Sequence, residues 1–172
     1  QRHGCLAETM VQPMVRQLHA ALRHLHAISI IHRDVKLENV LVETKAGGPS
    51  PSVKLCDLGH ACHLTEARLD QTFFGTPGYT APEVMRGPAW SPAADVWAMG
   101  VVMFALLANA LPFEAESAWL RPPDFSSRAW WQVSLDAKLL LQSILEPRLT
   151  ERGTIATVEL AVWMRTPRPP PA

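Results

Sequence analysis

One short polar segment of the chain combines residues that could move a proton, neutralise charge and bind a metal ion. It reads His32-Arg33-Asp34-Val35-Lys36-Leu37-Glu38-Asn39. Asp34 could accept the proton of a hydroxyl group, and Lys36 could neutralise charge on a transferred phosphoryl group. Asn39 offers a neutral oxygen, a hard ligand of the kind that Mg²⁺ accepts. These residue types suit phosphoryl transfer, a reaction that needs positioned charge and an oriented nucleophile.

Two further segments carry polar residues of the same kind. Asp57-Leu58-Gly59 directly follows Val53-Lys54-Leu55-Cys56, whose alternating pattern predicts a strand. The segment from Asp57 to Glu83 is rich in Gly, Thr and Pro, and it is too long for a plain connection, which indicates a functional loop.

The elements that must position these loops are mainly helical. Apolar spacing predicts a helix over Glu8 to His26, where Pro13 should cause a kink or a later start. Further helices are predicted over 94–107, over 135–145 with Ser134 as N-cap, and over 154–164. A short β pair is predicted from residues 40–42 and 53–56.

Five motifs, in one order and spacing, resemble those of eukaryotic protein kinases. His32 to Asn39 resembles the catalytic loop, and Asp57-Leu58-Gly59 resembles the D-F-G metal motif with Leu in place of Phe. Gly75-Thr76-Pro77-Gly78-Tyr79-Thr80-Ala81-Pro82-Glu83 resembles the substrate-facing end of the activation segment. The segments that begin at Asp95 and at Leu145 resemble the central helix and the stretch that ends in a buried arginine, here Arg152.

The resemblance implies an α+β, mainly α fold: the C-terminal lobe of a kinase, a helical bundle with a small β-hairpin, without the N-terminal lobe. The kinase portion would span residues 1–165, followed by a Pro-rich tail at 166–172. The implied activity is transfer of the ATP γ-phosphate to Ser or Thr of protein substrates, with ATP and Mg²⁺ as cofactors. Asp34 would be the catalytic base, Asn39 and Asp57 would bind Mg²⁺, and Leu41 would lie under the nucleotide.

The resemblance also assigns roles to residues around these groups. Lys36 and Thr76 are serine/threonine-kinase features, and Gly100 to Glu114 is similar to the calmodulin-dependent and SNF1-like kinase group. Glu38 would contact a basic residue upstream of the target hydroxyl. The residues with implied regulatory or structural roles are Arg33 and Thr72 (phosphate control), His32 and Leu58 (core packing), Asp95 (holding the catalytic loop) and Glu83 with Arg152 (a buried ion pair).

The sequence departs from the family in ways that bear on activity. The glycine-rich loop, the strand lysine and the hinge of the N-terminal lobe have no counterpart in the chain, so the chain alone is expected to transfer phosphate at a negligible rate. Cys62 stands where the family often has a second phosphate-binding basic residue, and Glu114 to Asp124 is shorter than the usual docking helix. The alternative function is a non-catalytic, pseudokinase-like scaffold or decoy. A small-molecule phosphotransferase is a weaker alternative.

Composition limits the partners and the compartment. Sixteen basic and sixteen acidic residues give a net charge of zero, which argues against nucleic acid or a membrane surface as the main partner. Three sparse cysteines favour a reducing, cytoplasmic or nuclear compartment. Cys56, His60, Cys62 and His63 could form a zinc site, but the same neighbourhood is needed for Asp57 and Mg²⁺. The Pro167 to Pro170 pattern could bind an SH3 domain, although so short a pattern is common by chance.

Overall fold

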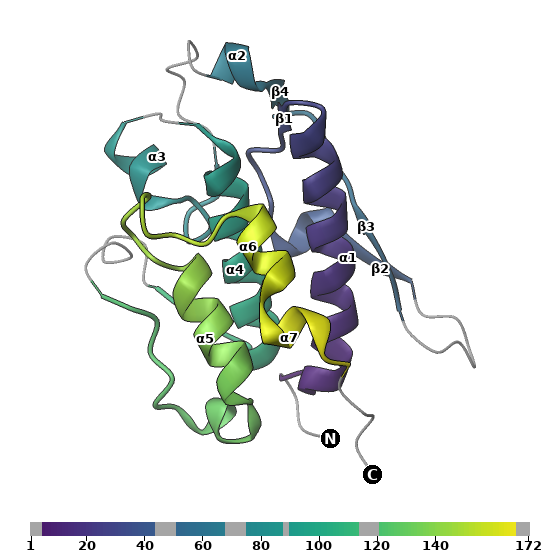
Figure 1. Ribbon diagram of the computed structural model, residues 1–172, viewed down its shortest axis with the longest axis vertical. Coiled ribbons are helices and arrows are strands. Elements are labelled where there is room, and N and C mark those ends of the chain that lie inside the picture. Colours follow the sequence, from purple (N-terminus) through teal and green to yellow (C-terminus); the bar gives the residue numbers. More distant parts are fainter. Residues whose placement is uncertain (1–4, 44–50, 68–74, 88–89, 114–120, 168–172) are drawn as a thin grey trace.

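The protein is mainly helical, with two small antiparallel sheets (Figure 1). The computed structural model describes residues 5–43, 51–67, 75–87, 90–113 and 121–167. The elements are α1 (Glu8–Ala27), β1 (Ile30–Ile31), the 3-10 turn η1 (Leu37–Asn39), β2 (Val40–Glu43), β3 (Ser52–Leu55), β4 (Cys62–His63), α2 (Leu64–Ala67), α3 (Pro82–Arg86), α4 (Pro92–Ala108), the 3-10 turn η2 (Arg128–Gln132), α5 (Leu135–Ile144), α6 (Ile155–Leu160) and α7 (Val162–Arg165).

The core is built around α4, which confirms the predicted central helix. Its residues are apolar on every side, so the helix can be stable only where other elements cover it completely. Helix α1 packs on one side of α4 and α5 packs on another (Figure 1). The backbones of α4 and α5 come close at Gly100, where an added Cβ would lie 2.9 Å from the Ile144 side chain. Among the described residues, every helix is too short or too polar to span a lipid bilayer.

Helix α1 begins at Glu8, so the later start, one of the two alternatives predicted for Pro13, is wrong. The carbonyl of Ala7 accepts hydrogen bonds from the backbone N–H groups of Met10 (2.8 Å) and Val11 (3.1 Å), which closes the first turn before the proline. Pro13 cannot donate to the carbonyl four residues earlier, that of Thr9. The cost is one helical hydrogen bond near the start, and the apolar face of α1 packed on α4 stabilises the helix beyond it.

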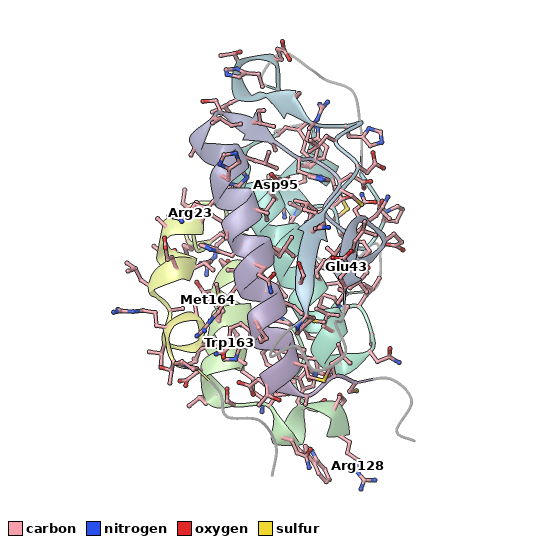
Figure 2. The ribbon with its side chains drawn as sticks, turned by 90° about the vertical axis from the view of Figure 1, so that its right-hand side faces the viewer. Arg23, Glu43, Asp95, Arg128, Trp163 and Met164 are labelled. Atoms are coloured by element: carbon pink, nitrogen blue, oxygen red, sulfur yellow. The ribbon has the colours of Figure 1, made fainter. Side chains whose placement is uncertain are left out.

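The first turn of α1 is hydrogen-bonded to residues in the C-terminal part of the chain. The Glu8 carboxylate accepts hydrogen bonds from the backbone N–H of Ser134 (2.8 Å), from its hydroxyl (2.7 Å) and from Nε1 of Trp163 (2.6 Å). Ser134 also caps α5 by accepting from the Ala137 N–H at 3.2 Å, as the sequence predicts. In Figure 2, Trp163 and Met164 lie near one end of α1 and Asp95 near the other.

The predicted β pair is confirmed as the hairpin β2–β3, in which Val40 pairs with Leu55 and Glu43 pairs with Ser52. The side-chain amide of Gln17 on α1 binds the other edge of β3: Nε2 donates to the carbonyl of Pro51 (2.9 Å), and Oε1 accepts from the N–H of Val53 (3.0 Å). The second sheet, β1–β4, was not predicted. Its strands have two residues each, too few to show an alternating pattern.

The predicted last helix is divided into α6 and α7 at Ala161, whose ψ of 140° is extended. Val158 and Trp163 are both buried on the core side. On one continuous helix their side chains would point about 140° apart, because residues are spaced at 3.6 per turn. The interruption lets both side chains enter the core, which the spacing within either short helix does not reveal.

Candidate active site

The loop that carries Asp34 is held at its base by Asp95 of α4. The two carboxylate oxygens of Asp95 accept hydrogen bonds from the backbone N–H groups of His32 (2.9 Å) and Arg33 (3.0 Å). Nε2 of His26, at the end of α1, lies 2.8 Å from the same carboxylate. Asp95 is buried, so these contacts replace the water that its charge would otherwise require. The position of the loop is therefore fixed by the helical core.

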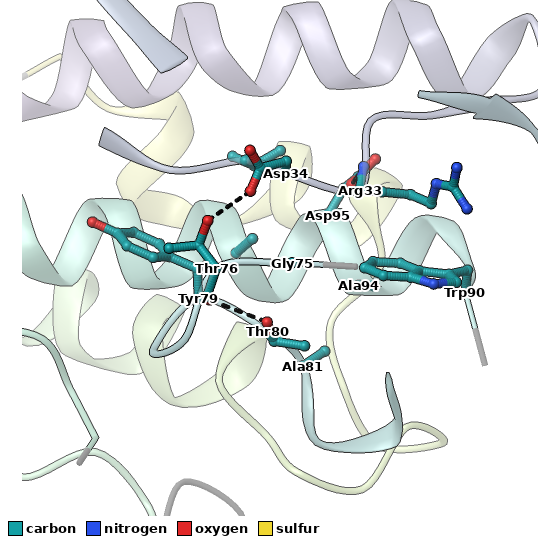
Figure 3. A pocket seen from close by; sticks show the side chains of 12 residues that line it. Arg33, Asp34, Gly75, Thr76, Tyr79, Thr80, Ala81, Trp90, Ala94 and Asp95 are labelled. Atoms are coloured by element: carbon teal, nitrogen blue, oxygen red, sulfur yellow. Dashed lines mark hydrogen bonds between the residues drawn. The ribbon is translucent and has the colours of Figure 1, made fainter. Parts of the chain in front are cut away.

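Asp34 lies at the centre of a hydrogen-bonded cluster with Lys36, Thr76 and Asn39. Its Oδ2 is 2.6 Å from Nζ of Lys36, and its Oδ1 accepts a 2.8 Å hydrogen bond from the Thr76 hydroxyl. Lys36 also donates to Oγ1 of Thr76 at 3.0 Å. Asn39 donates through Nδ2 to the Asp34 carbonyl (2.8 Å) and to Oδ2 (3.1 Å). Figure 3 shows Thr76 reaching Asp34 from the opposite wall of the pocket.

These contacts keep Asp34 ionised. Burial alone would raise the pKa of its carboxyl group, but the hydrogen bonds from Lys36, Thr76 and Asn39 and the charge of Lys36 together outweigh burial, so the pKa lies below its usual value of 3.8. Because the pKa is lower in the folded state than in the unfolded state, ionised Asp34 stabilises the fold above the unfolded pKa. That stabilisation is lost as the pH falls through the folded pKa.

Lys36→Met is expected to raise the pKa of Asp34. The substitution removes both the closest hydrogen bond and the nearby positive charge, while the burial that opposes ionisation remains. A ¹³C NMR titration of the Asp34 carboxyl carbon measures the effect, with Lys54→Met as a control, because Lys54 pairs with Glu43 at the surface. An unchanged titration midpoint in Lys36→Met would contradict the assigned cause.

The donor set near Asp34 suits Mg²⁺. Because Nδ2 of Asn39 is used by Asp34, its Oδ1 is the atom of the amide left for a metal ion. The N–H of Cys56, the residue before Asp57, donates to the backbone carbonyl of Asn39 at 2.9 Å, which joins the start of the Asp57 loop to the end of the Asp34 loop. Asp57 adopts a left-handed backbone conformation (φ 63°), and its carboxylate is exposed. One carboxylate and one amide are enough for Mg²⁺, which keeps its other sites for phosphate and water.

The zinc hypothesis finds no support in the geometry. Within the described ranges, no three His, Cys, Asp or Glu side chains are grouped so that they could hold a metal ion. Cys56 is used otherwise, since its Sγ donates to the carbonyl of Asn39 at 3.3 Å.

His32 and Leu58 are both predicted to pack in the core, but their environments differ. His32 is fully buried, and its Nε2 lies 3.1 Å from the carbonyl of Cys56. Leu58 is 56% exposed, so its predicted core position is wrong for the described structure. The left-handed conformation of Asp57 turns the chain outward just before Leu58. Leu41, expected under the nucleotide, is also open to solvent, with 52% of its surface exposed.

The segment that brings Thr76 to Asp34 depends on tight turns. Gly75 has a φ of +119°, and an added Cβ there would lie 2.7 Å from the Thr80 hydroxyl oxygen. Thr80 in turn donates to the carbonyl of Thr76 at 3.1 Å.

Burial, together with the negative charge of Glu38, raises the pKa of Tyr79 and keeps its phenol neutral. Glu38 itself is exposed on η1 beside this loop, whereas the predicted phosphate acceptor Thr72 lies outside the described residues.

This segment is anchored by an ion pair between Glu83 and Arg152. Nη1 and Nη2 of Arg152 contact the two carboxylate oxygens of Glu83 at 2.6 and 2.7 Å. Nε donates to the carbonyl of Glu146 (2.9 Å), and the guanidinium lies 4.9 Å from the Trp97 ring centroid. The structure therefore brings the two residues together, 69 positions apart in sequence, in the arrangement that the resemblance implied.

Sequence reasoning missed two residues that support the site. His26 entered the prediction only as the end of a helix, although its contact with Asp95 supports the loop that carries Asp34. Trp90 was not considered, although it lies against Arg33 in the pocket. Both contacts join residues far apart in the sequence, so no local pattern reveals them.

Comparison with known proteins agrees with this geometry. The sequence profile of the family described as "Protein kinase domain" matches residues 1–164. The chain is 37% identical over 179 aligned residues to a protein of Oryza sativa subsp. japonica assigned as CBL-interacting protein kinase 27, which covers 99% of this chain and 43% of that protein. It is 34% identical over 168 residues to testis-specific serine/threonine-protein kinase 3 of Homo sapiens (94% and 60% covered). It is 32% identical over 171 residues to serine/threonine-protein kinase dkf-2 of Caenorhabditis briggsae (94% and 14% covered).

The chain belongs to the protein kinase family. It spans less than two thirds of the length of each of these relatives. The predicted similarity to serine/threonine kinases, including the SNF1-like group, is confirmed by these relatives. The predicted kinase-like fold, mainly helical with small sheets, is also confirmed.

Proposed function

We propose that the chain is the catalytic-loop portion of a serine/threonine protein kinase, which transfers the γ-phosphate of ATP to a Ser or Thr hydroxyl. The observation that carries this proposal is the contact cluster of Asp34, Lys36 and Thr76, with Asn39 donating to the same aspartate. A scaffold without catalysis would not require an ionised, buried carboxylate with this set of donors.

Each residue of the cluster has a different role in the proposed phosphoryl transfer. Ionised Asp34 accepts the hydroxyl proton of the substrate and orients its oxygen toward the phosphate. Lys36 supplies positive charge near the transferred group, and Thr76 holds both side chains in place from the substrate-facing loop. Asn39 and Asp57 would hold Mg²⁺, which neutralises phosphate charge and orients the ATP phosphates when bound.

The surroundings of the cluster suggest the class of substrate. Thr76 lies where it contacts Asp34 and Lys36 together, which favours Ser or Thr as the phosphate acceptor over the longer Tyr. Glu38 is exposed beside this loop and offers a carboxylate to a basic residue upstream of the acceptor. We therefore propose protein substrates with an arginine on the amino-terminal side of the phosphorylated residue, in a cytoplasmic or nuclear compartment.

None of the described residues covers the face of the site where the nucleotide is proposed to bind. Asp57, Leu58 and Leu41 are all exposed there. Electrostatic contacts to phosphate are weaker in a wet site than in a closed one. We propose that the active form has a second, N-terminal lobe over this face and that the described elements form the C-terminal lobe. The 172-residue chain on its own is then expected to transfer phosphate negligibly.

The test is a phosphorylation assay with radiolabelled Mg·ATP on the natural full-length polypeptide. Three peptides are compared: one with Arg upstream of a Ser, one with that Arg replaced by Ala, and one with Tyr in place of the Ser. Phosphate transfer that is fastest to the Arg-Ser peptide and absent from the Tyr peptide supports the proposal. If no peptide is phosphorylated although Mg·ATP binds, the proposed kinase activity is wrong and the scaffold alternative stands.

A further inference from the structure

The backbone of Arg33 is in an unusual conformation directly before Asp34. Its φ is +68°, in the left-handed region that residues with a side chain rarely adopt. Such a conformation persists only where the surrounding structure supports it. One support is the hydrogen bond from the Arg33 N–H to Asp95. Because Asp34 follows immediately, whatever holds Arg33 also sets the direction of the catalytic carboxylate.

The side chain of Arg33 provides the second support. Its Nε donates to the carbonyl of His60 at 2.5 Å, which links the catalytic loop to the loop that begins at Asp57. Its guanidinium carbon lies 5.7 Å from the centroid of the Trp90 ring. Arg33 is 9% exposed and Trp90 5% exposed. Cation–π attraction is strongest for such a desolvated pair. Figure 3 shows both side chains at the same end of the pocket.

The contribution of Trp90 lies in its ring and not in its N–H group. Nε1 of Trp90 is buried and has no hydrogen-bond partner within the part of the chain that the structure describes. Trp90 precedes α4 by two residues, and Asp95 lies in the first turn of that helix. The segment from Trp90 to Asp95 therefore contacts Arg33 at two places. Asp95 accepts a hydrogen bond from its backbone N–H, and the Trp90 ring faces its side chain.

We propose that Trp90 is a positioning residue for the reaction: its indole ring holds the Arg33 side chain, and Arg33 in turn keeps the Asp34 loop in its reactive conformation. Trp90 thereby acts on phosphoryl transfer without contact to substrate or nucleotide. The inference rests on the proposed kinase function, but its structural step, the contact between ring and guanidinium, can be measured separately.

The kinetic test compares Trp90→Leu with Trp90→Phe in the full-length protein. Trp90→Leu is expected to lower kcat about tenfold while the KM for ATP changes less than about twofold, because the ATP-binding residues are untouched. Trp90→Phe keeps an aromatic face and loses only an unpartnered N–H, so its kcat should stay within about threefold of wild type. Equal losses in the two variants, or none in Trp90→Leu, would overturn the proposal.

The structural test is ¹H–¹⁵N NMR of the Arg33 Nε–H group, assigned with Arg33→Met. The aromatic ring should shift this proton in wild type and in Trp90→Phe, and the shift should be lost in Trp90→Leu. A resonance that is unchanged in Trp90→Leu overturns the contact even if the protein proves to have no kinase activity. If Trp90→Leu fails to fold, Arg33→Met replaces it in the assay, and a kcat equal to wild type then counts against the proposal.

Discussion

Asp34→Asn is expected to lower kcat by about 10²–10⁴-fold, the range that a positioned general base contributes. The amide cannot accept the hydroxyl proton, and it also removes the negative charge that Lys36, Thr76 and Asn39 are arranged to contact. The KM for Mg·ATP should change little, because the metal donors proposed here are Asn39 and Asp57. Single-turnover transfer from radiolabelled ATP to the Arg-Ser peptide measures the chemical step directly.

The matched control for this variant is Asp124→Asn. Asp124 is an exposed aspartate that accepts hydrogen bonds from the backbone N–H and the hydroxyl of Ser126, both at 2.8 Å, and it lies outside the catalytic cluster. Its kcat should equal that of wild type. An Asp34→Asn protein that is correctly folded and retains more than a tenth of the wild-type kcat would show that Asp34 is not the base.

Arg152→Met is expected to lower the free energy of unfolding by about 3–5 kcal/mol, the usual cost of breaking a buried ion pair by removing one partner. The Arg152 side chain is fully buried, and Glu83 keeps only 12% of its side-chain surface exposed. Without the guanidinium, the Glu83 charge remains largely desolvated, and the contact with the Trp97 ring is lost as well. Urea denaturation followed by circular dichroism measures the change.

Two further variants test whether the loss of stability in Arg152→Met comes from the broken ion pair or from lost packing. Arg148→Met removes an arginine whose side chain is 67% exposed and which pairs with Glu146 and Glu151 at the surface. Its cost should be below about 1 kcal/mol. The double variant Glu83→Gln/Arg152→Met should be more stable than Arg152→Met alone, because no unpaired charge is left. A double variant no more stable than the single one would show that the Arg152 side chain acts mainly through packing.

The sequence predicted the chemical residues of the site better than their surroundings. Asp34, Lys36 and Asn39 lie within six residues of one another, so local spacing alone makes their convergence expected. Thr76 lies 42 positions from Asp34 and could be placed beside it only through the family resemblance. The hairpin, the central helix and the Ser134 cap were likewise predictable, because each has a local signal in apolar spacing or residue type.

What the sequence did not predict depends on contacts between distant elements. Leu58 was placed in the core through the family resemblance, but it follows Asp57, whose backbone is left-handed, and it is exposed. The break at Ala161 follows from the need to bury both Val158 and Trp163, which only the neighbouring helices impose. Tertiary packing thus decides these details against the local pattern, as it often does where local propensities are weak.

The contact of Gln17 with β3 has a consequence for how the protein behaves in concentrated solution. A two-stranded ribbon normally leaves free N–H and C=O groups along its outer side, where a strand from another molecule could add and start aggregation. At β3, the carboxamide of Gln17 already occupies the carbonyl of Pro51 and the N–H of Val53. A single helical side chain thus closes that side to intermolecular strand addition at this point.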